Sequence, residues 1–136
     1  MRRLLASALF AVLASQTTAQ DLREMAYYRA EIGPEDFRSS RGARLTDFGA
    51  VLQQDRANVH RFGIRHAGDD VDPVFGDRTQ RARLPELYRQ HGTAPGFEDM
   101  VRRGEPFRLS VFVCGYGDNI AFIALAGEGE DHSGCF

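Results

Sequence analysis

Residues 45–63, LTDFGAVLQQDRANVHRFG, form the longest stretch of the chain that has both a helical period and recognisable ends. Apolar side chains recur in it at three- and four-residue spacing, which puts them in one stripe along a helix. They are Phe48, Val51, Leu52, Val59 and Phe62. Thr46 is a suitable N-cap, and Gly63 can take the left-handed conformation that ends a helix. The stretch predicts an amphipathic helix over Thr46–Phe62, around which the rest of the fold is expected to pack.

One charged residue, Asp55, lies near the centre of this apolar stripe. The next residue, Arg56, points away from the stripe, because successive residues turn by about 100° around a helix. A carboxylate that faces a core must be paired, since burying an unpaired charge is very costly. We therefore predict a structural ion pair between Asp55 and Arg81 or Arg83 of the next helix, because arginine forms bidentate pairs with carboxylates.

The N-terminus predicts export from the cytoplasm. Residues 1–19 resemble a secretory signal peptide, with two arginines, an apolar run over residues 4–14 and a small-residue cleavage site at residues 17–19. The alternative is an uncleaved anchor, but the apolar run is too short to span a bilayer, and no integral membrane segment is expected after cleavage. Every basic residue is arginine, which is typical of a GC-rich bacterial genome. We expect one periplasmic or secreted domain over residues 20–136.

Composition argues against a nucleic-acid partner. The formal charge of the chain is −2, and removal of the two signal arginines would make it −4. Acidic and basic residues are interspersed, without the basic stripe that is typical of nucleic-acid binding. Glycine-rich phosphate loops, metal-ligand spacings and nucleophile motifs are also missing from the sequence, so no cofactor is predicted.

Cys114 and Cys135 are the two cysteines of the chain. In an oxidising compartment, such a pair predicts a disulfide, here one that closes a loop of about twenty residues. The alternatives are a free reactive thiol, or a metal site with His132 that would lack a fourth ligand at a recognisable spacing.

The remaining segments predict an α+β fold. Met25–Ile32 suits either a strand or a helix, and a strand is favoured because Gly33 and Pro34 end it. Short helices are expected over Arg78–Leu84, Pro85–Gln90 and Phe97–Arg103. Phe107–Cys114 and Asn119–Ala126 predict a C-terminal β-hairpin. The central helix and the short helices should pack on one face of a small antiparallel sheet.

Three groups of residues are candidates for a site. Asp55 could act as an acid or base with His66. The acidic loop of Asp69, Asp70, Asp72 and Asp77 could bind Ca²⁺, although only Asp70 and Asp72 alternate as a calcium loop requires, so a solvated loop that caps the next helix is favoured. Tyr116 is placed at the hairpin tip, where an exposed aromatic residue could contact a partner.

These patterns favour a small, non-catalytic binding domain whose partner is an envelope protein or a small ligand. No set of nucleophile, base and oxyanion donors is apparent in the sequence. The alternatives are a small periplasmic hydrolase that uses Asp55 and His66, and a calcium-binding module that uses the Asp69–Asp77 loop.

Overall fold

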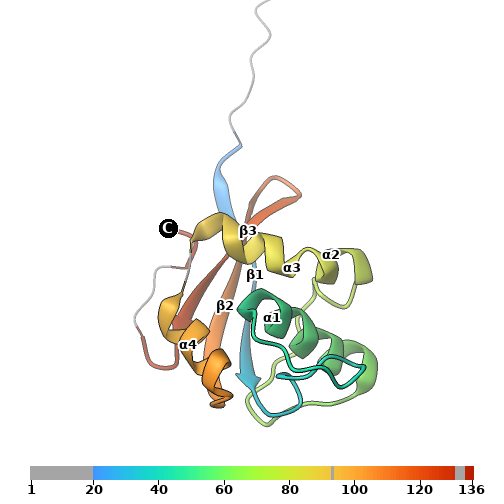
Figure 1. Ribbon diagram of the computed structural model, residues 1–136. Coiled ribbons are helices and arrows are strands. Elements are labelled where there is room, and N and C mark those ends of the chain that lie inside the picture. Colours follow the sequence, from blue (N-terminus) through green and yellow to red (C-terminus); the bar gives the residue numbers. More distant parts are fainter. Residues whose placement is uncertain (1–19, 93, 131–133) are drawn as a thin grey trace, which may run out of the picture.

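The computed structural model describes residues 20–92, 94–130 and 134–136, so the predicted signal peptide lies outside the described residues. Strands β1 (Leu22–Ile32), β2 (Phe107–Tyr116) and β3 (Asn119–Gly127) form an antiparallel sheet in the order β1-β2-β3. Four helices accompany the sheet (Figure 1). The predicted α+β fold with a C-terminal hairpin is therefore confirmed.

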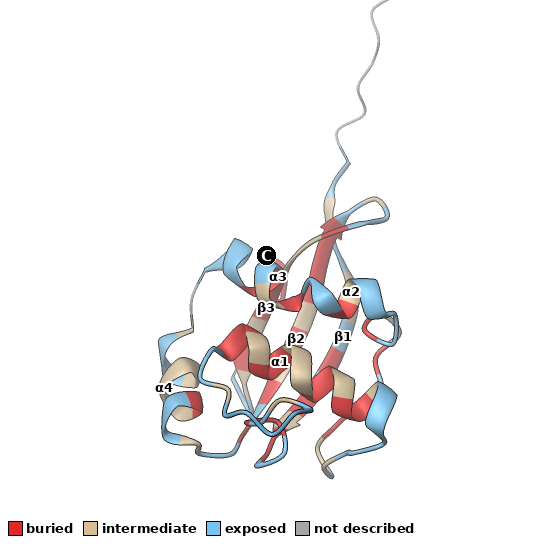
Figure 2. Ribbon diagram, turned by 45° about the vertical axis from the view of Figure 1, so that its right-hand side comes forward, coloured by how far each residue is buried: buried red, intermediate tan, exposed pale blue. Residues whose placement is uncertain are grey.

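The helices pack on one face of the sheet and enclose a single main core (Figure 2). They are α1 (Phe48–Ala57), which continues into a π-helical turn η1 (Asn58–Phe62), then α2 (Arg78–Ala82), α3 (Leu84–His91) and α4 (Pro95–Arg103). Leu109, Val111 and Val113 of β2 point to the helices and are buried, because alternate residues of a strand face the same side.

The central helix is present, but its two ends differ from the prediction. Its N-cap is Asp47, whose side chain accepts from the backbone N–H of Ala50 at 2.8 Å, rather than Thr46. Gly63 ends it in the left-handed conformation with φ 67°, as predicted. The last turn, η1, is π-helical, which amounts to one extra residue in the helix. The side chains after Ala57 are therefore rotated around the helix axis, relative to the positions that an α-helical period predicts.

The strand prediction for Met25–Ile32 is confirmed, and β1 begins earlier, at Leu22. The hairpin is also confirmed, but its strands extend into the segment expected to be a loop. Only Gly117 and Asp118 separate β2 from β3, and Gly117 has a φ of 57° that favours glycine.

The predicted disulfide between Cys114 and Cys135 is present, and both residues are buried. It ties the C-terminal segment to β2, 21 residues earlier in the chain. The alternative metal site cannot be placed, since His132 lies outside the described residues. Among the described helices, none has the length and apolar character needed to cross a membrane.

We predict that replacing both cysteines by alanine lowers the free energy of unfolding by about 3 kcal/mol, because the open chain gains entropy when it unfolds. Urea unfolding of the variant and of the oxidised protein measures the difference. Equal transition midpoints for the two proteins would contradict a stabilising role for the disulfide.

Candidate functional site

Arg56 is the centre of a buried polar network that joins α1 to the loop over residues 64–76. Its side chain is fully buried. Its Nε donates to Asp55 Oδ2 at 2.7 Å, and its Nη1 donates to Asp72 Oδ2 at 3.2 Å and to the Asp70 carbonyl oxygen at 2.9 Å. Its Nη2 lies 3.5 Å from Asp69 Oδ1. One guanidinium is thus shared by three carboxylates.

Asp55 lies in the core, but its predicted partners were wrong. Its ion pair is with Arg56. Arg81 donates instead to two backbone carbonyls of the loop before α2, and Arg83 donates to Gln80 and to a carbonyl of β3. The error arose because the helical period assigns Arg56 to solvent, whereas the loop over residues 64–76 covers that side of α1.

The four aspartates of the acidic loop bind different parts of the protein. Asp69 and Asp70 accept hydrogen bonds from β1, and Asp72 accepts from the two N–H groups of the turn that follows it. Asp77 is the N-cap of α2, as predicted. Within the described chain, no group of three or more His, Cys, Asp or Glu side chains is arranged to hold a metal ion. The arrangement does not support the calcium alternative.

Two of these aspartates close part of the outer edge of β1. The N–H of Arg29 lies 3.0 Å from Asp70 Oδ2, and the N–H of Glu31 lies 2.9 Å from Asp69 Oδ1. The N–H of Asp70 donates in return to the Arg29 carbonyl at 3.0 Å. Since the inner edge of β1 pairs with β2, these bonds occupy backbone groups that a further strand would use.

His66 contacts carboxylates other than Asp55. Its Nε2 lies 2.9 Å from Glu35 Oε2, and its Nδ1 lies 3.5 Å from both Asp36 Oδ2 and Asp69 Oδ2. Asp55 is only 1% exposed and faces Arg56. The two residues proposed for hydrolysis therefore bind different partners, and Asp55 is shielded from solvent.

Burial changes the proton affinity of this network. It raises the pKa of Asp55 from 3.8 to about 7, even though the adjacent Arg56 lowers it. Three carboxylates share the Arg56 guanidinium, so its attraction for the Asp55 carboxylate does not offset the cost of burying that charge. In addition, Asp55 Oδ1 has no hydrogen-bond partner among the described residues. Burial alone would lower the pKa of His66, but the hydrogen bond to Glu35 and the nearby carboxylates raise it.

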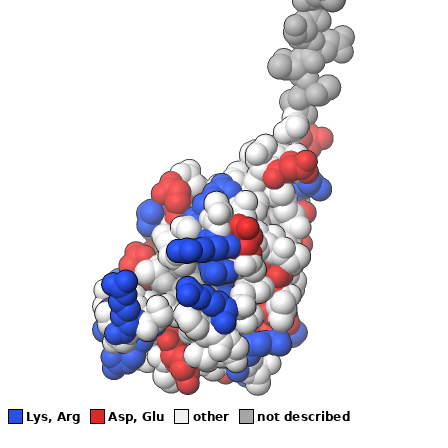
Figure 3. All heavy atoms as spheres, turned by 90° about the vertical axis from the view of Figure 1, so that its right-hand side faces the viewer, with Lys and Arg blue, Asp and Glu red and all other residues white. Residues whose placement is uncertain are grey.

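The most distinctive surface feature is a groove of about 430 Å³ between α1, η1, α2 and the loop over residues 38–45. We call it the arginine groove, because Arg61, Arg78 and Arg81 line it together with polar Ser40 and Gln54. Its lining contains no carboxylate. On the side of the molecule where α2 lies, Figure 3 shows arginine side chains gathered near the centre of the face. Guanidinium groups in such a setting attract anions.

The arginines of the groove differ from those elsewhere in their pairing. Among the described residues, every arginine outside residues 38–83 forms an ion pair with a carboxylate, and within that range only Arg56 does. Arg61 lies over the Phe62 ring at 5.0 Å, and Arg78 has no ion pair. The sequence gives a local indication of arginines without nearby carboxylates. Residues 56–68 and 78–85 each contain three arginines and no acidic residue.

The π-helical turn η1 forms one wall of the groove. Buried contacts hold its inner side: Asn58 donates to Asp36 Oδ1 at 2.8 Å, and His60 Nε2 lies 2.6 Å from Asp72 Oδ2. Phe62, predicted to face the core, is instead 43% exposed at the groove, because the wider turn rotates it outward. π-Helical turns are often found at functional sites.

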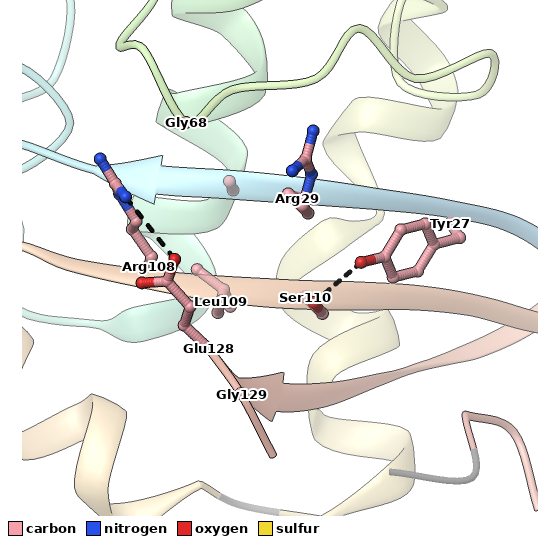
Figure 4. Close-up of a pocket in the computed structure, with 9 residues that line it drawn as sticks. Tyr27, Arg29, Gly68, Arg108, Leu109, Ser110, Glu128 and Gly129 are labelled. Atoms are coloured by element: carbon pink, nitrogen blue, oxygen red, sulfur yellow. Dashed lines mark hydrogen bonds and ion pairs between the residues drawn. The ribbon is translucent and has the colours of Figure 1, made fainter. Parts of the chain in front are cut away.

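A cavity of about 270 Å³ on the other face of the sheet is the second candidate (Figure 4). Its charged and polar side chains are already paired within the protein. Arg29 binds Asp70, Arg108 lies near Glu31 and Glu128, and the Tyr27 hydroxyl is 3.1 Å from Ser110 Oγ. A ligand would have to break these contacts, so the cavity is a weaker candidate than the arginine groove.

Tyr116, the predicted contact residue, is 43% exposed. It pairs with Leu22 at the start of β1, whereas the loop that borders the arginine groove follows the end of β1. Tyr116 therefore lies at the opposite end of the strand from the groove, and a contact role for it stays a prediction.

No protein-family model, curated protein or solved structure matches this chain.

We predict that Arg56→Met lowers the free energy of unfolding by about 3–5 kcal/mol, because it leaves buried carboxylates without their cation. The matched control is Arg89→Met, which removes an exposed arginine paired with Glu86 and should cost at most about 1 kcal/mol. Urea unfolding measures both values. Similar losses in the two variants would show that the network does not stabilise the fold.

We also predict that the free energy of unfolding decreases as the pH rises from about 4 to about 7. The unfolded chain loses the Asp55 proton near pH 3.8, whereas the folded protein keeps it up to about pH 7. The stabilisation from this group is therefore complete below pH 3.8 and is lost as the pH rises through about 7. The raised pKa of His66 also lowers the stability with rising pH, but only above pH 6.5, where the unfolded chain loses this proton first. Asp55→Asn should flatten the dependence, and an equal slope in the variant would contradict the assignment to Asp55.

Proposed function

We propose that this chain is a small, non-catalytic binding domain that works outside the cytoplasm and binds an anionic partner in the arginine groove. The observation that carries the proposal is the set of arginines without carboxylate partners, which line one groove of an acidic protein. Arginine pairs well with carboxylate and phosphate groups, and the exposed guanidiniums of Arg61 and Arg78 form no ion pair with the described residues. Arg81 is buried and donates to two backbone carbonyls, so it adds positive charge to the groove wall.

The location outside the cytoplasm is supported by the signal-like N-terminus and by the disulfide. Disulfides persist in oxidising compartments and are rare in the cytosol. The predicted destination, periplasmic or secreted, is part of this proposal.

The two alternatives have less support. A hydrolase would need Asp55 and His66 to act together, but each binds other partners and Asp55 is buried. A calcium module would need the loop aspartates to converge, but they bind separate backbone and side-chain groups.

The test is a titration with citrate and pyrophosphate, followed by NMR chemical shifts of the backbone amides. The largest shifts should occur at residues of the groove, and added salt should weaken them. The double variant Arg61→Glu/Arg78→Glu should bind these anions at least about tenfold more weakly, a loss of about 1.4 kcal/mol or more.

The control is Arg89→Glu/Arg103→Glu, which changes the net charge equally at arginines that are paired with Glu86 and Glu105. Its affinity should stay close to that of the unmodified protein. If both double variants lose affinity equally, the effect is one of net charge and the groove is not the site. A loss caused by Tyr116→Ala would move the site to the hairpin.

A further inference from the structure

We propose that the occupant of the arginine groove is an extended acidic segment of a partner protein, with carboxylates on both sides of an apolar side chain. The inference rests on the proposed function, because it names the kind of partner that the same site would bind.

The site is longer than the arginine groove alone. A second cavity of about 550 Å³ continues the arginine groove and shares Ser39, Ser40, Gln54 and Phe62 with it. Each cavity alone has the volume of a typical small-ligand pocket, about 300–1,000 Å³. A single small anion would fill only part of the combined site, whereas an extended peptide could follow its length.

The middle of the site presents an apolar surface. Phe62 is 43% exposed and Ile64 is 39% exposed, and both line the second cavity. Phe62 belongs by sequence to the core-facing stripe, but the π-helical turn turns it outward. Adjacent exposed apolar side chains bordered by charge are typical of protein–protein contacts, in which aromatic residues and arginine contribute most of the affinity.

Charged side chains lie on both sides of this apolar surface. Arg61, Arg78 and Arg81 lie at one end of the site, and Arg38 and Glu35 line the other. The Glu35 carboxylate is bound by His66 Nε2 at 2.9 Å, which leaves Arg38 as the described charged group without an ion pair at that end. Arg38 donates to the Gly42 carbonyl at 3.3 Å and has no ion pair among the described residues. Carboxylates on both sides of one apolar residue would match this order of charge, apolar surface and charge.

A protein segment fits this site better than a nucleic acid. The chain is acidic overall, which repels a long polyanion, and the favourable charge is confined to one groove. The apolar middle, formed by Phe62 and Ile64, would gain from an aliphatic or aromatic side chain, which a phosphate backbone lacks.

The test is selection of a phage-displayed random peptide library on the purified protein. Enriched peptides should share acidic residues on both sides of an apolar residue. Synthetic copies should bind at least tenfold more weakly to Arg61→Glu/Arg78→Glu and to Phe62→Ala. The control variant Arg89→Glu/Arg103→Glu, whose arginines are paired with carboxylates outside the groove, should bind them as the unmodified protein does. Thermal unfolding checks that each variant is folded.

Enrichment of peptides without acidic residues, or equal enrichment on the charge-reversed variant, would overturn the inference. So would an oligonucleotide that binds the groove more tightly than the selected peptides. If citrate binds the groove but no acidic motif is selected, the inference fails and the proposed function stands. If neither citrate nor peptides respond to Arg61→Glu/Arg78→Glu, both fail.

Discussion

The buried guanidinium of Arg56 is the group on which the polar interior of this protein depends. It binds Asp55 within its own helix and Asp69 and Asp72 from the loop over residues 64–76. It also lies over the Tyr28 ring of β1, with its Cζ 4.4 Å from the ring centroid. A buried charge of this kind is tolerated only when its partners are all in place, so the contact holds helix, loop and sheet in one arrangement.

The same segment of chain connects this interior to the surface. On the inner side of η1, Asn58 and His60 bind buried aspartates, while on its outer side Arg61 and Phe62 face the arginine groove. The π-helical turn therefore separates two environments over five residues. Because the inner contacts restrain the turn, this wall of the groove is already in place before a partner binds, which lowers the entropic cost of binding.

Much of the fold could be predicted from local sequence, whereas the site could not. The central helix, the hairpin and the disulfide follow from periodicity, turn residues and the cysteine pair, all of which depend on neighbours in the chain. The burial of Arg56 depends on a loop more than ten residues away, which the helical period treats as solvent. The exposure of Phe62 depends on a π turn, for which the residue pattern gave no signal. The two acid-free, arginine-containing segments indicate where arginines without ion pairs could lie, but Arg56 in one of them is paired with three carboxylates, so the fold is needed to tell them apart.

The aspartate loop also covers part of the free edge of the sheet. A strand at the end of a sheet exposes backbone groups that can pair with another molecule, which makes such edges sites of aggregation. Here Asp69 and Asp70 bind the outer N–H groups of Glu31 and Arg29, so the C-terminal half of β1 cannot serve as a template for a further strand. The acidic loop therefore covers an edge at which strands of other molecules could otherwise pair, and its loss is expected to favour aggregation.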